Sequence, residues 1–453
     1  MKTILSLIIF VVLVYWIYRI YFSNKVKSRA VKCGKGDYYV FSRNMYFVIF
    51  TVCTAPIFLG SLSLLKYGLW FMVVVALLIL GKVRIKFEAM TVMYSIFFLW
   101  LCYTMTYTPV LRDGAMMLVK YSLPMLFLWL GYSAINNEKD LIVFLKVVNM
   151  VACVYCFTMG GFAATFIPPL YRFSMGIFST YAAFADYLTA VFIVPILLYW
   201  LTKEKKYIFC ALLMVLSTVL QSVRTGIGGM MLVFVVAMLL RHKWKAVPGV
   251  VLGGALFLGV ILFVPSVNEK FFGDDAGKIT ATDIVQGDVL SMENIDTNGR
   301  NAIWELVLEL FYKGKESTGS GLGTAIRFLK DKWLFEGDSA GLIHNDYVQL
   351  LAETGYIGTA LFVLFYIFVT HKVVSHIISR RCSTFTKLTG IMALSSMAGI
   401  AFCMYFDNVV SNSMQSMVMP YIYLGFFLKA LDLESKENKV INNSTHTTCY
   451  SIV

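Results

Sequence analysis

Three residues have side chains suited to moving a group away from a diphosphate. Arg224 lies in Gln221-Ser-Val-Arg224-Thr-Gly-Ile-Gly228, between two apolar runs, and Arg300 begins an amphipathic segment. Arginine presents a planar fork of N–H donors to phosphate oxygens and keeps its charge. His344, one of five histidines, is a residue type that titrates near neutrality and can take a proton from an attacking hydroxyl. Together these residue types predict transfer of a sugar from a lipid pyrophosphate to a hydroxyl.

Each of these residues also has a purely structural interpretation. Arg224 could be a snorkelling side chain that marks a helix end, and Arg300 and His344 could be solvated loop residues. Arg172 and the lone carboxylate Asp186, which lies within an apolar run, are further candidates with the same alternative. Ionisable side chains are uncommon in or beside membrane spans, so these positions define where to look for a site.

A glycine turn, Gly319-Ser-Gly-Leu-Gly323, is a different kind of candidate. Backbone N–H groups in such a turn, here those of Gly321 and Gly323, can bind phosphate, although the alternative is an ordinary turn. It lacks the Gly-Lys-Ser/Thr end of a nucleotide-binding loop. No cysteine lies between residues 267 and 353, so we expect no disulfide framework or cysteine metal site there. The sequence predicts neither a metal nor a cofactor.

The elements that position these residues are expected to be membrane helices. The chain has 453 residues, of which 59% are hydrophobic and 14% charged, and its mean hydropathy is +0.74. An ordinary soluble domain is about 45–50% apolar and about 25% charged. This composition excludes a soluble enzyme, and it excludes a receptor with a single span of about 20 residues. We predict an all-α polytopic membrane protein.

Apolar runs of spanning length predict about 12–13 transmembrane helices, with one large external (periplasmic) helical loop. Two of the thirteen runs, 67–81 and 226–240, are short. The runs fall near residues 3–22, 46–65, 67–81, 88–108, 115–135, 142–165, 182–201, 207–223, 226–240, 246–266, 355–371, 388–406 and 415–430.

Basic clusters recur at every second loop, and short basic loops stay in the cytoplasm. Thirteen spans put these clusters on one side with the C-terminal tail, and the N-terminus outside. Residues 267–353 carry 8 basic and 15 acidic side chains, a net charge of −7, whereas the rest of the chain carries +20. The total of +13 therefore reflects topology, and no nucleic-acid partner is expected. The clusters lie at 25–35, 82–86, 203–206, 241–245 and 372–387.

We divide the chain into an N-terminal bundle of about ten spans (1–266), a large external loop (267–353), C-terminal spans (354–431) and a cytoplasmic tail (432–453). Within the loop, Asn301–Tyr312 is expected to form an amphipathic helix that can lie on the membrane surface. His344 is expected to share a helical face with later apolar residues at the mouth of the next span. The loop helix is predicted from Ile303, Leu306, Val307 and Leu310, opposite Glu305 and Glu309, and the His344 face from Val348 and Leu351.

These motifs, in this order, resemble the bacterial O-antigen polymerase and O-antigen ligase superfamily. The resemblance covers roughly residues 170–370 in motif and the whole chain in topology. The most specific segment is a His-Asn pair that leads through Glu-x-Gly-x-x-Gly into a span. The matching segments are Ser222-Val-Arg224-Thr-Gly226, Gly299-Arg300-Asn-Ala-Ile-Trp304, Gly319-Ser-Gly-Leu-Gly323 and His344-Asn345-Asp-Tyr347-Val-Gln-Leu-Leu-Ala-Glu353-Thr-Gly355-Tyr-Ile-Gly358.

The resemblance implies an inverting, metal-independent glycosyltransferase of the inner membrane, with an undecaprenyl-pyrophosphate-linked glycan as donor and a site on the external face. It implies that Arg224 and Arg300 hold the donor pyrophosphate and that His344 acts as the base or positions the acceptor. After Arg172, Ser179-Thr-Tyr-Ala-Ala-Phe stands where the family often has an Asn-Pro-Asn-like turn. Further substrate-binding candidates are Arg172, Asn345, Tyr347, Gly321 and Gly323.

The shared motifs do not separate a repeat-unit polymerase from a ligase that transfers polymer to lipid A core. We favour the polymerase, because each surface-polysaccharide locus tends to carry its own. A flippase or transporter is the remaining alternative, for which only Asp186 and Lys146 look suitably buried. The expected partners are the lipid-linked oligosaccharide and membrane lipids, and a chain-length regulator stays open.

Overall fold

The computed structural model describes residues 42–57, 63–177, 181–263, 300–336, 342–379, 382–412 and 414–449. It also describes residues 8, 11, 12, 15 and 268 and two short strands, β1 (Ala30–Lys32) and β2 (Tyr38–Val40), which pair antiparallel. The first predicted span, 3–22, and residues 269–299 of the predicted loop therefore lie almost entirely outside the described residues.

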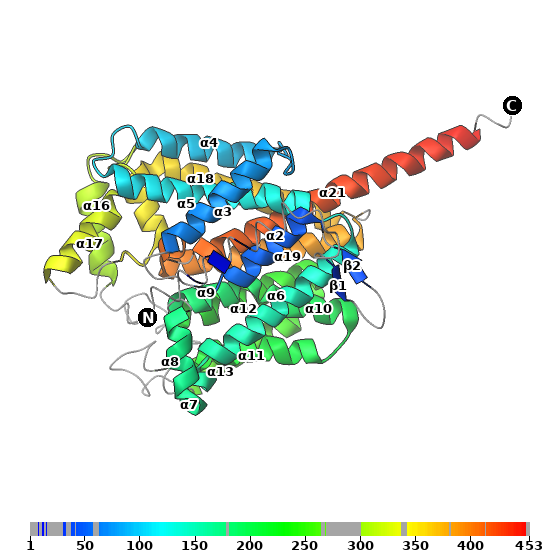
Figure 1. Cartoon of the computed structure of the whole chain (residues 1–453), viewed down its shortest axis with the longest axis horizontal. Coiled ribbons are helices and arrows are strands. Elements are labelled where there is room, and N and C mark those ends of the chain that lie inside the picture. Colours follow the sequence, from blue (N-terminus) through cyan, green and yellow to red (C-terminus); the bar gives the residue numbers. More distant parts are fainter. Residues whose placement is uncertain are drawn as a thin grey trace.

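Helices account for nearly all of the rest (Figure 1). They are α2 (Arg43–Thr54), α3 (Ser63–Ile79), α4 (Ala89–Thr104), α5 (Leu111–Ala134), α6 (Glu138–Met159), α7 (Gly161–Phe166), α8 (Pro168–Ile177), α9 (Tyr181–Val191), α10 (Ile193–Thr202), α11 (Lys206–Leu220), α12 (Arg224–His242), the 3₁₀ turn η3 (Lys243–Ala246), α13 (Val247–Phe263), α16 (Arg300–Phe311), α17 (Thr324–Glu336), α18 (Asp346–Ile378), α19 (Thr384–Phe406), α20 (Val409–Asn412) and α21 (Met414–Cys449).

The described residues contain 7 helical stretches that are long and apolar enough to cross a membrane. A helix rises about 1.5 Å per residue, so about 20 residues cross a hydrocarbon core of about 30 Å. Shorter apolar helices accompany them in α3, α4 and α11. The prediction of an all-α polytopic membrane protein is confirmed. The spanning stretches are α5, α6 with α7, α9 with α10, α12 with the start of α13, α18, α19 and α21.

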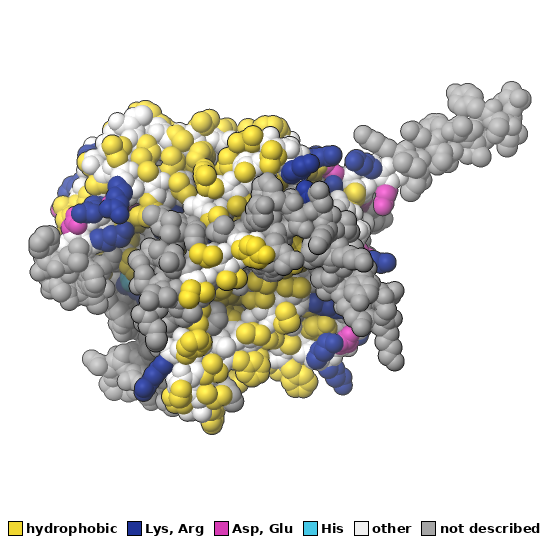
Figure 2. Space-filling model, in the orientation of Figure 1, with side chains coloured by type: hydrophobic (Ala, Val, Ile, Leu, Met, Phe, Trp, Pro, Cys, Tyr) yellow, Lys and Arg dark blue, Asp and Glu magenta, His cyan; other side chains and the backbone are white. Residues whose placement is uncertain are grey.

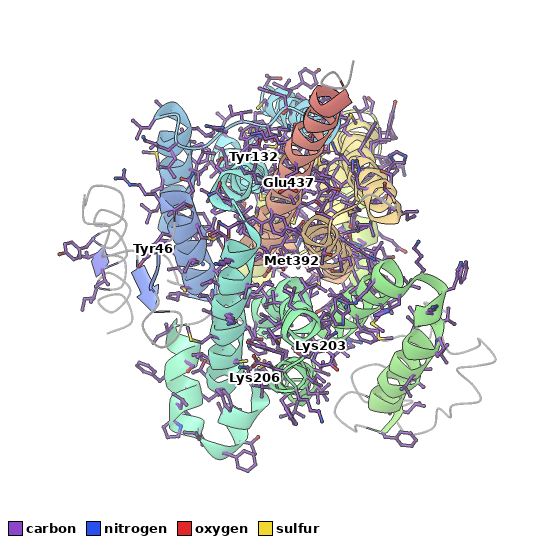
Figure 3. All side chains as sticks on the ribbon, turned by 90° about the vertical axis from the view of Figure 1, so that its right-hand side faces the viewer. Tyr46, Tyr132, Lys203, Lys206, Met392 and Glu437 are labelled. Carbon is purple, nitrogen blue, oxygen red and sulfur yellow. The ribbon has the colours of Figure 1, made fainter. Side chains whose placement is uncertain are left out.

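One end of the bundle gathers basic loops that are far apart in sequence. Lys86 pairs with Asp432 on α21 at 2.7 Å, and Lys372 near the end of α18 pairs with Glu88. Figure 3 looks onto this end, where Lys203 lies between α10 and α11. Figure 2 shows Lys and Arg side chains at this right-hand end and a second group at the left-hand end, with hydrophobic side chains over much of the described surface between them. Predicted basic clusters thus share one end of the bundle, as the alternation of spans requires.

Helices α12 and α19 run side by side in opposite directions. Glycines let their backbones approach closely. A Cβ on Gly399 would lie 2.4 Å from Val233 Cγ2 and 3.1 Å from the carbonyl oxygen of Gly229. Nearer the other end, the Cys403 thiol lies 3.7 Å from the carbonyl oxygen of Thr225. The first turn of α12 therefore lies beside the last turn of α19, at the end opposite the basic loops.

A small helical cap covers this second end (left in Figure 1), made of α16, α17 and the first turns of α18. The predicted loop helix is confirmed as α16, but α17 was not predicted. The apolar side of α16 packs on α17 and α18 through a cluster around Val307, although Leu310 of the same predicted face is 48% exposed. Helix α18 begins at Asp346, within the last part of the predicted loop, and kinks at Gly355, where φ is +68°. The residues of the cluster are Val307, Ala325, Leu329, Ile343 and Ala352.

Candidate functional site

Arg224 begins α12 after a tight turn from α11. Ser222 in this turn has φ +52°, a left-handed conformation that non-glycine residues rarely adopt. The expected short hinge between two apolar helices is present, since α11 ends at Leu220 and α12 begins at Arg224. The turn directs the N-terminus of α12 toward the last turn of α19, where Thr225 meets Cys403.

Arg300 begins α16, and its guanidinium Nη1 donates a hydrogen bond to the carbonyl oxygen of Phe406 at 2.6 Å. Phe406 is the last residue of α19, so this bond joins a cation to the negative end of that helix. One turn along α16, the indole Nε1 of Trp304 donates to the carbonyl oxygen of Ile343 at 2.8 Å. The same indole packs edge-on against Tyr405. Helix α16 is thus held between the end of α19 and the segment before α18.

His344 lies just before α18 and has φ +54°. Its backbone N–H donates to Asn408 Oδ1 at 2.6 Å, and its ring Nδ1 lies 3.2 Å from Asp407 Oδ1. The expectation that His344 shares a helical face with Val348 is therefore wrong, because Asn345 caps the helix and His344 stands outside it. A left-handed non-glycine residue costs about 1–3 kcal/mol and persists where the surroundings enforce it, which is common at functional sites.

Asp407 is the residue that sequence reasoning missed. Its side chain is 8% exposed, against 26% for His344, so the carboxylate holds the inner side of the ring. The sequence feature that could have identified it is the Asp407-Asn408 pair between the predicted spans 388–406 and 415–430. No pattern among neighbouring residues connects that pair to His344. Hydrogen bonds hold the pair: the Asn408 N–H donates to Asp407 Oδ1 at 2.8 Å, and the Asn408 side-chain amide donates to Asp346 Oδ1 at 3.5 Å.

The two arginines and the histidine, predicted from separate motifs, converge at the C-terminal end of α19. Arg300 bonds to Phe406, His344 contacts Asp407, and Arg224 begins the helix that packs on Cys403. Arg224 and Arg300 are also the first residues of their helices, and the N-terminus of a helix carries partial positive charge. This arrangement can bind an anion beside a histidine whose orientation a carboxylate fixes.

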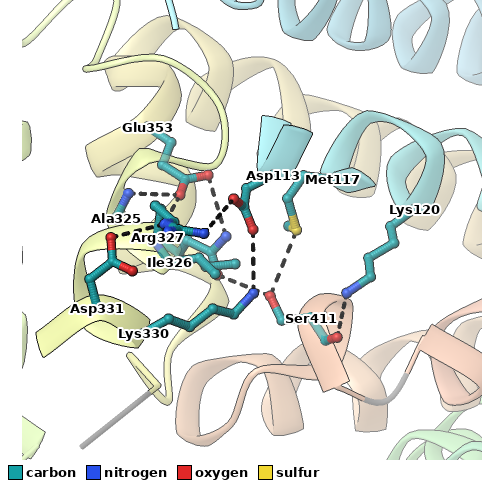
Figure 4. Close-up of polar contacts among 11 residues, drawn as sticks. Asp113, Met117, Lys120, Ala325, Ile326, Arg327, Lys330, Asp331, Glu353 and Ser411 are labelled. Carbon is teal, nitrogen blue, oxygen red and sulfur yellow. Dashed lines mark hydrogen bonds and ion pairs between the residues drawn. The ribbon is translucent and has the colours of Figure 1, made fainter. Parts of the chain in front are cut away.

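The glycine turn belongs to a different part of the cap, next to Glu353 (Figure 4 shows Glu353 beside Ala325 and Ile326). The Gly321 N–H donates to the backbone carbonyl oxygen of Glu353 at 2.9 Å, and the Gly323 N–H bonds to the Glu353 carboxylate. That carboxylate also accepts from the N–H groups of Ala325 and Ile326, at 3.2 and 3.4 Å, in the first turn of α17. The sequence led us to expect that this turn would meet a phosphate, but the Gly321 N–H bonds to a backbone carbonyl oxygen and the Gly323 N–H to a carboxylate of the chain itself.

Two other predicted substrate-binding residues have structural contacts. Asn345 is buried, and its Oδ1 accepts from the N–H groups of Tyr347 and Val348, which is the bonding of a helix N-cap. The Tyr347 hydroxyl donates to the carbonyl oxygen of Ala401 at 3.0 Å and so joins α18 to α19. Both residues support the position of His344, and a role in substrate binding stays a prediction.

The remaining ionisable candidates differ in their burial and in their distance from the end of α19. Arg172 is exposed on α8, which packs mainly on α6 and α7, and the described contacts do not join it to the other arginines. Asp186 on α9 is fully buried and contacts the Cys403 thiol, which lies beside the carbonyl oxygen of Thr225. Lys146 is exposed, contrary to our expectation. Within the described segments, no group of three His, Cys, Asp or Glu side chains could hold a metal ion.

Comparison with known proteins adds one finding about this region. Residues 209–363 match the family model described as O-antigen ligase. The matched segment contains Arg224, Arg300, His344 and the glycine turn, and its match confirms the resemblance to the O-antigen polymerase and ligase superfamily. The chain has no match among the curated proteins.

Proposed function

From its match to the O-antigen ligase family over residues 209–363, we propose that this chain is a surface-polysaccharide repeat-unit polymerase. The donor is a glycan carried on undecaprenyl pyrophosphate, and the acceptor is a sugar hydroxyl of another lipid-linked glycan. The observation that carries the proposal is the contact of His344 with Asp407 beside the Arg300–Phe406 bond.

The arginines receive the leaving diphosphate. Its charge grows as the bond from the anomeric carbon to the diphosphate oxygen breaks. Fixed cations stabilise such a group most when they are positioned before the reaction. Arg300 is positioned by Phe406, and Arg224 by the turn that starts at Gln221. The acidic character of residues 267–353, with a net charge of −7, leaves these arginines as the attractive groups for a diphosphate.

His344 acts as the general base. An Nδ1–H that donates to Asp407 leaves the lone pair on Nε2 for the acceptor hydroxyl. The hydroxyl oxygen then attacks the anomeric carbon from the side opposite the diphosphate, its proton passes to Nε2, and the electron pair of the broken bond leaves on the diphosphate. The configuration at the anomeric carbon is inverted.

The site faces the outside of the inner membrane in this proposal. The basic loops lie at the opposite end of the bundle, and short basic loops stay in the cytoplasm. No ATP is available outside the cytoplasm, so the donor itself must carry the energy of the transfer, and a sugar ester of pyrophosphate does so.

A ligase that transfers finished polymer to lipid A core is the second candidate, because the matching family is described by that activity. The same site serves both reactions, and only the acceptor differs. The surface polysaccharide of a deletion strain separates them on a gel. A core that bears one repeat unit indicates a lost polymerase, whereas long polymer left on the lipid carrier indicates a lost ligase.

The site itself is tested by complementing the deletion strain with Arg224→Ala, Arg300→Ala or His344→Ala. Each variant is expected to reach the membrane and to abolish glycan transfer; loss of general base catalysis alone lowers rates about 10²- to 10⁴-fold. The matched control is Arg112→Ala, an exposed arginine at the same end of the bundle. Polymer of normal length from all three site variants would overturn the proposal.

A further inference from the structure

A cavity of about 710 Å³ opens on the cap, between the α4–α5 loop and helices α16 and α17. This cavity is separate from the site at the end of α19. Its lining contains none of the residues of that site, which are Arg224, Arg300, His344 and Asp407. Four aromatic side chains line it, Tyr103 and Tyr107 from α4 and the α4–α5 loop and Phe311 and Phe328 from α16 and α17.

The two tyrosines present their rings to solvent. Tyr103 is 50% exposed and Tyr107 37% exposed, although large aromatic side chains are usually covered. They pack edge-on against each other with ring centroids 5.7 Å apart, and Trp100 supports Tyr103 from behind at 5.2 Å. The Tyr107 hydroxyl bonds to the carbonyl oxygen of Thr318, which fixes the α4–α5 loop to the cap. Ring contacts and this hydrogen bond therefore hold the exposed rings in place.

Polar groups complete the cavity. Arg327 Nε lies 2.9 Å from Asp331 Oδ2 at the rim, one turn apart on α17. Arg327 also approaches Asp113 on α5 at 3.9 Å (Figure 4). The lining thus offers paired donors and acceptors beside apolar ring faces.

This combination fits a saccharide better than a diphosphate or a lipid chain. The C–H faces of a sugar ring pack on the electron-rich faces of aromatic rings, and its hydroxyls bond to a guanidinium and a carboxylate together. A diphosphate would compete with Asp331 for Arg327 and would meet one further cation of the lining, Lys315, while the anion position at the start of α17 is already filled by Glu353. A lipid chain would bury the Arg327–Asp331 pair without replacing its contacts with water.

Helix α16 connects this cavity to the candidate site. Arg300 lies at its first residue and Phe311, which lines the cavity, at its last, so the two ends are about 16 Å apart. A single sugar cannot cover this distance, whereas an oligosaccharide of several units can.

We propose that the cavity around Tyr103 is a distal saccharide subsite, which holds a glycan chain several units away from the point of transfer. The inference rests on the proposed function and extends it to recognition of an oligosaccharide. Affinity then depends on glycan length, because only a chain long enough to reach the cavity gains the aromatic contacts.

The test uses the purified full-length chain and oligosaccharides of graded length from partial hydrolysis of the host cell's own surface polysaccharide, free of lipid and phosphate. Tyr103→Ala is expected to weaken binding of the longer fragments about tenfold and to leave the shortest unaffected. Tyr103→Phe keeps the ring and should bind normally. The matched control is Tyr356→Ala, since Tyr356 is 53% exposed and does not line the cavity.

Equal binding of long fragments to wild type and Tyr103→Ala would overturn the inference, as would no binding of any fragment to wild type. Farnesyl phosphate is the second probe, and a Tyr103→Ala defect confined to it would assign the cavity to a lipid phosphate instead. Repeating the titration in His344→Ala separates the two proposals, because the subsite binds glycan without transfer. Persistent transfer by His344→Ala overturns the proposed function, whatever Tyr103→Ala does to binding.

Discussion

The Nδ1 atom of His344 lies 3.2 Å from Oδ1 of Asp407, although the two residues are 63 positions apart and helices α18 and α19 lie between them in the chain. The carboxylate is the more buried partner, so it can hold the ring from the protein side while the other face stays accessible. The same relationship orients histidine in acid–base catalysis on unrelated folds.

Asp407→Asn is therefore expected to keep the fold and lower glycan transfer about 10²- to 10⁴-fold, because an amide can fix the wrong tautomer of His344. Single-turnover transfer by purified protein measures the effect. Glu316→Gln, which changes an exposed carboxylate on the same cap, serves as the control and should be silent. Asp407→Asn with wild-type turnover would mean that the carboxylate has no part in the reaction.

Replacing Arg224 or Arg300 by lysine keeps the charge but removes the planar fork of donors. We expect each change to lower transfer about 10- to 100-fold, since a hydrogen bond to a charged group contributes about 1.5–3 kcal/mol. Steady-state kinetics with a lipid-linked donor would measure the loss. Full activity in both lysine variants would show that point charges suffice and that bidentate contacts are not used.

Gly399→Ala is expected to disturb the packing of α12 on α19, because the added Cβ would lie 2.4 Å from Val233 Cγ2. Overpacking of this kind costs about 1–3 kcal/mol, and it would also displace Arg224 from the end of α19. Thermal unfolding in detergent and transfer activity should fall together. Gly68→Ala is the comparison, since a Cβ there meets nothing within 4 Å; equal stability of both variants would argue against the close packing.

Glu353→Gln is expected to loosen the cap, because the carboxylate bonds to N–H groups of the glycine turn and of the first turn of α17. Loss of a charge at a helix N-terminus costs about 0.3–2 kcal/mol. Limited proteolysis between residues 313 and 336 should become faster, whereas the exposed Glu309→Gln should behave as wild type. Unchanged cleavage in Glu353→Gln would contradict the internal anion contact.

Local properties were enough to predict the membrane helices, the basic loops and helix α16. They also singled out Arg224, Arg300 and His344 as candidate site residues. Hydropathy, charge and helical spacing are carried by neighbouring residues, so the sequence by itself determined them. Only the tertiary structure decided that Asp407 contacts His344, that the Glu353 carboxylate bonds to the glycine turn and the start of α17, and that Arg172 is exposed on α8. The contacts of Asp407 and Glu353 join residues 63 and 28 positions apart, and no local pattern encodes which helix ends will meet when the bundle packs.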